Sequence, residues 1–267
     1  MVLFVWWPFV GVWAEEMSDF AEQAQTTPVY ERIVSLDLCM DWLLAFYADP
    51  AQVAALSPLH RRFPLPIQSR NWPVHDGSLE QIVSLNADLV VVGEFNALLL
   101  RSRLERLGHP VEILSLPRSL GEVEIYLNQF FQLLGLAVSN PIAEDQWQRE
   151  LEKDAPRLLL LGANGVGTGQ QTFEDQLLTQ AGWQNYVLAS GYVRLDLEQL
   201  AIDPPDAILW SAPESAALAN QFAQHPVLSK LLPASAWLSL DYWRWQCPGP
   251  WTYELIDQLA ELRKVLE

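Results

Sequence analysis

The stretch SLEQIVSLNADLVVVG (Ser78–Gly93) is echoed by DLEQLAIDPPDAILWS (Asp196–Ser211), which begins 118 residues later. In each copy a side chain suited to N-capping, Ser78 or Asp196, precedes apolar residues spaced i, i+3 and i+4, the pattern of a short amphipathic helix. A few polar residues follow, and then an apolar run of strand length, LVVV or AILW. The stretch predicts a helix, a turn and a buried strand, which is half of an α/β unit, in two copies.

The repeat extends in both directions from this stretch. Apolar strand patterns at Arg32–Leu38 and Arg157–Ala163 match each other, as do Leu107–Pro117 and Leu231–Asp241, each with a helix end, a break and a strand. The matched elements keep one order at offsets of 118 to 125 residues. This order indicates two lobes of similar architecture. The alternative is that β-α-β patterns of any α/β chain resemble one another.

Alternating strands and helices predict an α/β fold of two similar lobes, each with a mostly parallel sheet. The predicted boundaries are a signal peptide at 1–14, a lead-in at 15–30, an N-terminal lobe at 31–118, a connecting helix region at 119–154 and a C-terminal lobe at 155–267. Strands are predicted at Ile33–Leu36, Val53–Leu56, Leu89–Val92 and Val111–Leu116. Helices are predicted near Met40–Tyr47, Leu79–Leu85, Asn96–Leu107 and Thr252–Leu266.

The region between the two copies predicts a helix that joins the lobes. Ser119 is suited to N-capping, and five apolar residues follow at helical spacing: Leu120, Val123, Leu127, Phe130 and Leu134. We expect a single rigid helix over 119–135, with helix resuming over 141–153 after a break at Asn140-Pro141. A helix, unlike a Gly/Ser linker, would hold the lobes at a nearly fixed separation.

The charge and the N-terminus bear on where the protein works. A net charge of −17 argues against nucleic acid as a partner, because phosphate binding needs clustered Lys and Arg. Residues 1–14 carry no charge and are too few to span a membrane. They resemble the core of a secretory signal peptide, although the basic n-region is missing. No cysteine stands at the cleavage point, so we expect a soluble periplasmic protein without a lipid anchor. We also expect it to be a monomer.

The two cysteines, Cys39 and Cys247, are 208 residues apart and fit no metal-binding spacing. In an oxidising compartment they could pair. The interpretation that we adopt is two separate thiols, with a disulfide as the alternative.

No motif argues for catalysis. The glycine-rich segment 162–169 fits neither the dinucleotide nor the P-loop pattern, and predicts a turn whose bare backbone allows close approach. The four histidines have no metal-ligand spacing, and no G-x-S-x-G is present. The rival to a binding protein is a metal-dependent enzyme on a two-lobe α/β scaffold that uses His75, Asp76 and Glu94.

Twelve tryptophans are unusual in 267 residues, and several fall where strands are predicted to end. Trp72 precedes the first repeat helix, Tyr192 precedes the second, and Trp243 and Trp245 follow the last strand. In open parallel sheets, ligands bind beyond the carboxyl ends of the strands. Aromatic side chains there suit a large, flat or apolar ligand.

These stretches together resemble a known family. Their order and spacing resemble those of the cobalamin and iron-siderophore class of substrate-binding proteins of ATP-binding-cassette (ABC) importers. The stretches that carry the resemblance are RIVSLDLCMDWLLAFYADPAQVAALSP, HDGSLEQIVSLNADLVVVG, TFEDQLLTQAGWQN and GYVRLDLEQLAIDPPDAILW. The resemblance covers about residues 31–262. It implies two lobes joined by one rigid helix, with the ligand in the cleft between them.

The resemblance also implies roles for single residues. A glutamate on each lobe would dock onto arginines of the membrane permease, and these match Glu80 and Glu198. Trp72 and, more loosely, Trp243 match tryptophans that contact the corrin ring. The candidate ligand-binding residues are Asp37, Cys39, Trp42, Trp72, His75, Phe95, Gly167, Tyr192, Trp243 and Trp245.

The ligand implied is cobalamin or a ferric siderophore, with haem as an alternative, and no resident cofactor or metal is implied. Arginines near the predicted cleft would suit an anionic ferric chelate equally well: Arg70, Arg118, Arg194 and Arg244. The sequence therefore leaves the ligand open, with a lean toward cobalamin.

Overall fold

The computed structural model describes residues 30–61, 71–138, 149–212, 218–240, 245, 247–264 and 266. The predicted signal peptide, the lead-in before Tyr30 and Trp243 lie outside this range.

The N-terminal lobe is a four-stranded sheet in which every pairing is parallel. Its strands, in the spatial order β2-β1-β3-β4, have these bounds: β1 Ile33–Ser35, β2 Val53–Ala55, β3 Leu89–Gly93 and β4 Val111–Leu114. Its helices are α1 (Leu38–Tyr47), α2 (Leu79–Ser84) and α3 (Leu98–Arg106). All of these elements lie within a few residues of their predicted bounds. The central strand β3 is buried along its whole length, as expected when helices cover both faces of a parallel sheet.

The C-terminal lobe has a mixed sheet in the order β10-β9-β5-β6-β8, with β7 also paired to β5. Its strands are β5 Arg157–Leu161, β6 Val166–Thr168, β7 Gln184–Asn185, β8 Tyr192–Arg194, β9 Ala207–Trp210 and β10 Trp237–Leu238. Its helices are α5 Phe173–Gln180, α6 Leu197–Ile202, α7 Pro226–Leu231 and α9 Trp251–Arg263. The pairs β5–β6 and β6–β8 are antiparallel, and the others are parallel. Short 3-10 helices lie at Pro50–Gln52, Pro58–Arg61, Ala163–Gly165, Leu218–Gln224 and Ala234–Ala236.

The predicted repeat is confirmed in space. Strands β1, β3 and β4 are successive parallel neighbours, and β5, β9 and β10 repeat this arrangement. The repeated aspartates explain part of the sequence echo. The Asp88 carboxylate accepts the backbone N–H of Arg32 at 2.8 Å, and the Asp206 carboxylate accepts that of Arg157 at 2.7 Å. Asp88 thus links the start of β3 to the start of β1, and Asp206 links the start of β9 to the start of β5.

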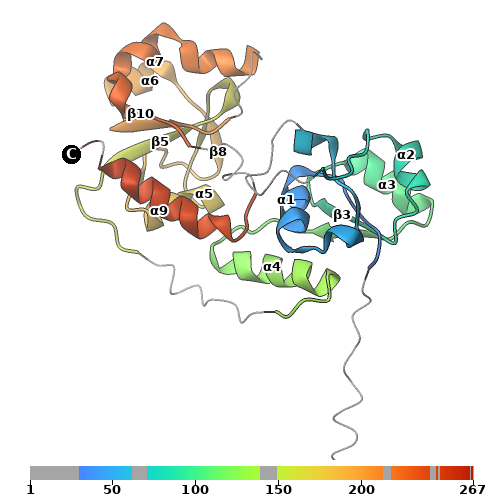
Figure 1. Cartoon of the computed structure of the whole chain (residues 1–267). Coiled ribbons are helices and arrows are strands. Elements are labelled where there is room, and N and C mark those ends of the chain that lie inside the picture. The colour runs from blue at the N-terminus through green and yellow to red at the C-terminus, as the bar shows by residue number, and fades with distance from the viewer. Residues whose placement is uncertain are drawn as a thin grey trace, which may run out of the picture.

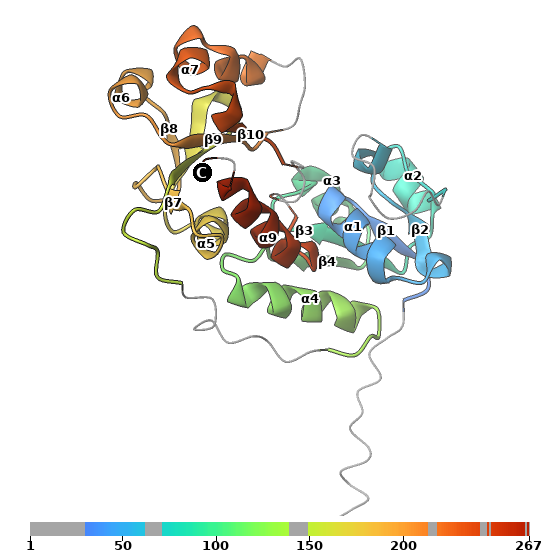
Figure 2. The same cartoon turned by 60° about the vertical axis from the view of Figure 1, so that its left-hand side comes forward.

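The two lobes share one hydrophobic core. A single buried cluster includes Ile33 and Leu89 of the first sheet, Leu158 and Leu209 of the second, and Leu255 of α9. Figures 1 and 2 show the two lobes beside each other, with α9 running between them and α4 beneath. Because the junction is packed like a domain interior, wide opening of the lobes would expose apolar surface.

The connecting helix differs from its prediction. Helix α4 covers Gly121–Leu133, its N-cap is Leu120 rather than Ser119, and residues 149–153 are not helical. The predicted helix over 141–148 lies outside the described residues. Helix α4 does bridge the lobes, because the Leu120 N–H donates to Gln176 Oε1 of α5 at 2.8 Å, while the Phe131 ring lies 4.7 Å from that of Tyr47 in α1.

Helix α9 is a second connection, which the sequence did not predict. At its start, the Trp251 ring packs against Trp42 of α1 with the ring centroids 5.3 Å apart. Near its end, the Leu259 carbonyl accepts the indole N–H of Trp183 at 2.8 Å. The helix therefore contacts the N-terminal lobe at one end and the C-terminal lobe at the other.

Cys39 and Cys247 form a disulfide, with their Cα atoms 4.9 Å apart, so the expectation of two separate thiols is wrong. The physical reason is tertiary. Packing of Trp251 on α1 brings the residues just before α9 against the start of α1, and spacing along the sequence carries no sign of that contact.

Asp41, in α1, gives the N-terminal lobe a pH-dependent stability. Its carboxylate accepts the Ser57 backbone N–H at 2.8 Å and the Ser57 hydroxyl at 2.7 Å. Burial raises the pKa of Asp41 from 3.8 to about 7, although hydrogen bonds from Ser35 and Ser57 oppose the rise. Because the folded pKa exceeds the unfolded one, the folded state binds the extra proton. This contribution to stability is complete below about pH 4 and is lost as the pH rises through 7.

We therefore expect Asp41→Asn to flatten the pH dependence of unfolding. Between pH 5 and pH 8 the wild type should lose about 2 kcal/mol of stability that the variant keeps. Urea unfolding at both pH values measures this difference, with Asp257→Asn, at an exposed position of α9, as the control for charge removal. Parallel slopes for the wild type and Asp41→Asn would contradict the assignment.

Candidate functional site

A cleft of about 520 Å³ lies between the lobes. The N-terminal lobe contributes residues that follow β3 and β4, and the C-terminal lobe contributes the start of α5, the start of β8 and the segment before α9. The lining residues are Glu94, Phe95, Leu116, Pro117, Arg118, Gln171, Thr172, Phe173, Glu174, Gly191, Tyr192, Trp245 and Pro248. Strands β3 and β4 thus meet the cleft at their carboxyl ends, where parallel sheets bind ligands.

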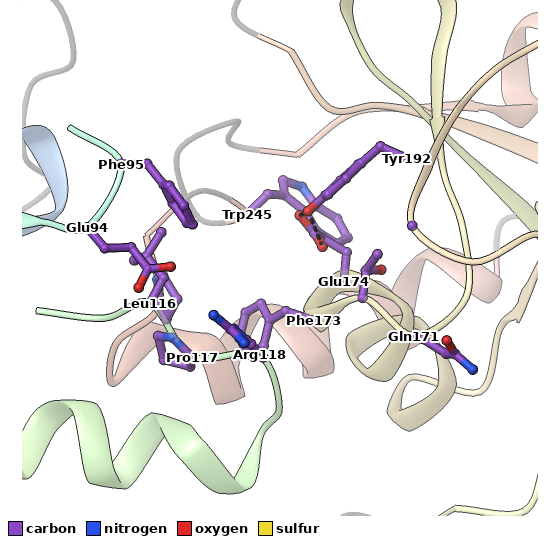
Figure 3. A pocket seen from close by; sticks show the side chains of 13 residues that line it. Glu94, Phe95, Leu116, Pro117, Arg118, Gln171, Phe173, Glu174, Tyr192 and Trp245 are labelled. Carbon is purple, nitrogen blue, oxygen red and sulfur yellow. Dashed lines mark hydrogen bonds between the residues drawn. The ribbon is translucent and has the colours of Figure 1, made fainter. Parts of the chain in front are cut away.

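Phe95 forms one wall of the cleft, and Figure 3 shows its ring facing the cavity. The side chain is 69% exposed. Its loop is held from behind, because the Gly93 N–H donates to Asp37 at 2.5 Å and Arg101 donates to the Glu94 carbonyl at 2.8 Å. An exposed aromatic ring on an anchored loop is a preformed surface for an apolar ligand.

Tyr192 and Glu174 form the opposite wall (Figure 3). The Tyr192 hydroxyl donates to the two Glu174 carboxylate oxygens at 3.1 and 3.2 Å. Burial raises the pKa of Glu174. Burial and the neighbouring Glu174 carboxylate raise the pKa of Tyr192 to about 12, so the phenol keeps its proton at neutral pH.

Trp245 and Arg118 complete the cleft. The Trp245 side chain is 2% exposed, and its buried indole nitrogen has no hydrogen-bond partner among the described residues. Figure 3 shows the Arg118 side chain directed into the cavity. Its guanidinium makes no ion pair within the described part of the chain. Arg118 therefore directs a positive charge into the cleft.

Three of the predicted ligand-binding residues, Phe95, Tyr192 and Trp245, line this cleft together. Trp72 does not line it. That side chain is half-buried and packs against the shared core. Trp243 lies outside the described residues.

Four other predicted residues have structural roles away from the cleft lining. Asp37 caps α1 through the N–H groups of Cys39 and Met40. Cys39 is in the disulfide, and Trp42 is fully buried against Trp251. Gly167 lies in β6, where a Cβ atom would meet Leu195 at 2.7 Å, so this glycine permits close packing.

His75 is also buried away from the cleft. Its Nδ1 accepts the Gly77 N–H at 3.0 Å, which leaves Nε2 to donate to the Ser35 carbonyl at 2.8 Å. Burial lowers the pKa of His75, in keeping with this neutral form. Both ring nitrogens are occupied, so the rival hypothesis of a metal site at His75, Asp76 and Glu94 loses its imidazole ligand. No group of three or more His, Cys, Asp or Glu suited to a metal occurs among the described residues.

The sequence did not single out Phe173 and Glu174, which line the C-terminal side of the cleft. They begin α5, after the N-cap Thr172, whose hydroxyl accepts the Asp175 N–H at 3.1 Å. In an α/β fold, residues at the start of a helix that follows a strand often lie at the ligand cleft. The stretch TFED (Thr172–Asp175) begins such a helix, so its pattern could have indicated these two residues.

The two predicted docking glutamates occupy equivalent places on the two lobes. Glu80 is in the first turn of α2 and Glu198 in the first turn of α6, and both are exposed. In Figure 2, α6 and α2 lie on opposite outer sides of the molecule, and neither glutamate lines the cleft. Across the ranges that the structure covers, no helix has the length and apolar character needed to cross a bilayer.

Comparisons with known proteins place the fold. No protein-family model matches the sequence, and no curated protein matches it. Solved structures do match. A periplasmic haem-binding protein from Roseiflexus sp. RS-1 has a TM-score of 0.66 at 21% identity, over 89% of this chain and 99% of the other. A periplasmic vitamin B12-binding protein of Vibrio cholerae has a TM-score of 0.60 at 18% identity, over 89% and 98%.

A possible iron-binding periplasmic solute-binding protein from Staphylococcus epidermidis has a TM-score of 0.67 at 13% identity, over 88% of this chain and 99% of the other. By their descriptions these three proteins are periplasmic binding proteins for iron, vitamin B12 and haem. The chain therefore has the two-lobe fold of periplasmic solute-binding proteins for haem, iron and vitamin B12. This is the class that the sequence resembles.

Proposed function

We propose that this protein is the exported, periplasmic solute-binding component of an ABC importer, and that it captures a corrinoid such as cobalamin in the interlobe cleft. The protein then delivers the ligand to a membrane permease that docks on Glu80 and Glu198. The observation that supports this proposal is the cleft itself, where aromatic side chains from both lobes face one cavity: Phe95, Phe173, Tyr192 and Trp245.

The charge of the cleft favours a corrinoid over a ferric siderophore. In the part of the lining that the structure describes there are one cation, Arg118, and two carboxyl groups, Glu94 and Glu174. A ferric chelate that carries several negative charges would meet repulsion from the carboxylates, because opposing like charges cost several kcal/mol when they lose solvent. A macrocycle with neutral amide arms avoids that repulsion. Its flat apolar faces suit the aromatic walls, where each stacked pair adds about 0.5–1.5 kcal/mol beyond burial.

Haem is the second candidate, because the cleft contains a tyrosine hydroxyl. Tyrosine can ligate haem iron, and Tyr192 donates to Glu174, which could accept the phenolic proton when a metal replaces it. The raised pKa of Tyr192 opposes this ligation. Among the described residues that line the cleft, one arginine, Arg118, is available for the two haem propionates. For these two reasons we rank haem second.

Capture should involve little motion of the lobes. The shared core, α4, α9 and the Cys39–Cys247 disulfide all join the two lobes. Hinge closure needs an interface that can open with little loss of packing, and this junction does not provide one. The protein should therefore bind through a largely preformed cleft.

A ligand titration tests the proposal. Cyanocobalamin should quench tryptophan fluorescence with saturation at one equivalent and bind more tightly than haemin or a ferric tricatecholate. Tighter binding of haemin would move the assignment to the second candidate. Absence of binding by all three ligands would refute both.

Phe95→Ala should weaken cyanocobalamin binding by about tenfold, because truncation removes a stacking wall worth about 1.4 kcal/mol. Isothermal titration calorimetry measures the change. Phe46→Ala is the matched control, since Phe46 is also partly exposed but does not line the cleft. Equal effects of the two substitutions, or no effect of Phe95→Ala, would contradict the placement of the ligand.

A further inference from the structure

A second, smaller pocket of about 240 Å³ adjoins the cleft on the side of the C-terminal lobe. The two cavities share Glu174, Tyr192 and Trp245 in their linings. The remaining lining residues of the smaller pocket are Leu160, Gly162, Ala163, Val166, Thr168 and Ser211. Since three side chains border both cavities, a ligand in the cleft could extend an arm into the smaller pocket.

This pocket lies at the carboxyl ends of the parallel strands β5 and β9, the position in which open sheets bind ligands. Its walls are fixed by backbone hydrogen bonds. The Gly162 N–H donates to the Val166 carbonyl at 2.7 Å, and the Ser211 N–H donates to the Leu161 carbonyl at 2.9 Å. Ser211 and Gly162 are therefore held on a rigid frame, and the pocket is preformed.

Polar side chains line this pocket beside its apolar ones. Thr168, which is 6% exposed, and Ser211 contribute hydroxyl groups, each of which can donate and accept a hydrogen bond. Among the described residues, the Trp245 indole N–H is buried and has no hydrogen-bond partner. A buried donor without a partner costs about 1–3 kcal/mol, so this indole N–H calls for a bound partner.

The polar groups in the pocket favour a neutral substituent of the ligand, here called an arm, that carries both a hydrogen-bond donor and a hydrogen-bond acceptor. Glu174 is the one charged residue among the described residues of the lining, and it accepts a hydrogen bond from Tyr192 while retaining other lone pairs. A carboxylate arm would face this carboxylate without a compensating cation. An ammonium arm could pair with Glu174 but would offer no acceptor to the indole N–H. A primary carboxamide supplies N–H donors to Glu174 and a carbonyl oxygen to the hydroxyl and indole donors.

We propose that the smaller pocket is a subsite for a carboxamide arm of the ligand, and that Glu174 makes it select against a carboxylate arm. The inference rests on the proposed corrinoid-binding function, because corrinoids carry such amide arms around the macrocycle. Tyr192 acts as a positioning residue, since its hydroxyl holds the Glu174 carboxylate at the border of the two cavities.

The test compares cyanocobalamin with its separate monocarboxylic acids, in each of which one amide is hydrolysed, by titration calorimetry on the full chain at neutral pH. At least one acid should bind the wild type about tenfold more weakly than cyanocobalamin, the size of one lost hydrogen bond to a charged group. Glu174→Gln should reduce that penalty to about threefold or less, because the facing charge is gone. Glu94→Gln is the matched control, since Glu94 lines the cleft but not the smaller pocket.

Ser211→Ala provides a second test that does not depend on folding of the Glu174 variant. It should weaken cyanocobalamin binding by about fivefold and leave the acid penalty in place. The subsite is overturned if every acid binds the wild type within threefold of cyanocobalamin, if Glu174→Gln and Glu94→Gln change the penalty equally, or if Ser211→Ala leaves the affinity unchanged. Any of these results with tight cyanocobalamin binding rejects the subsite alone. Loss of all corrinoid binding by the wild type rejects the proposed function together with it.

Discussion

Uptake through the permease should be abolished when Glu80 and Glu198 are both replaced by arginine, while affinity for the ligand stays unchanged. Both carboxylates are exposed in first helical turns, and neither lines the cleft. If they pair with cations of the permease, each reversal turns an attraction into a like-charge contact, at a cost of several kcal/mol. Two such contacts would weaken the affinity for the permease so far that the complex would not form at working protein concentrations.

Transport of labelled cyanocobalamin into proteoliposomes that contain the cognate permease measures this effect, and calorimetry on the same preparation measures ligand binding. The double variant Glu105→Arg/Glu150→Arg makes the same change in net charge at two other exposed positions and serves as the control. Normal uptake by Glu80→Arg/Glu198→Arg, or equal loss in the control, would remove the docking role from these two helices.

Replacing both Cys39 and Cys247 by serine should lower the free energy of unfolding by about 4 kcal/mol. The disulfide spans 208 residues of sequence, so it restricts the unfolded chain over most of its length. A cross-link that closes a long loop removes more entropy from the unfolded state than one that closes a short loop. The substitution also frees the segment with Trp245 and Pro248, both in the cleft lining, so ligand affinity should fall as well.

Urea unfolding of the oxidised wild type, the reduced wild type and the double serine variant separates the effect of the bond from that of the substitutions. Reduction of the wild type should reproduce the stability loss of the variant, and the same reductant should leave the variant unchanged. An unfolding midpoint of the variant equal to that of the oxidised wild type would show that the bond does not contribute to stability.

Local pattern predicted much of the fold. The helices α2 and α6 and the strands β3 and β9 fall within the repeated stretch, because capping, helical spacing and buried strand runs are properties of neighbouring residues. The recurring aspartates, Asp88 and Asp206, reflect a shared tertiary contact with the first strand of each lobe. Periodicity therefore indicated the repeat, and the hydrogen bonds explain part of its sequence.

The candidate site was less predictable, because burial and pairing are tertiary properties. Phe95, Tyr192 and Trp245 could be placed near strand ends by position alone, and they line the cleft. Trp42 in α1, the helix that follows β1, and His75, which precedes α2, were candidates as well, yet both are buried in structural contacts. A sequence shows that an aromatic or imidazole follows a strand, but only the packed chain determines which side of the strand end it occupies.

The path of α9 has a consequence for biogenesis. Trp251 fills space beside Trp42 and Phe46, more than 200 positions earlier in the chain. The hydrophobic core of the N-terminal lobe is thus complete only when the last helix has packed against it. Contacts between residues so far apart in sequence form slowly. Truncation before this helix should leave even the amino-terminal half incomplete, so maturation must await the whole chain.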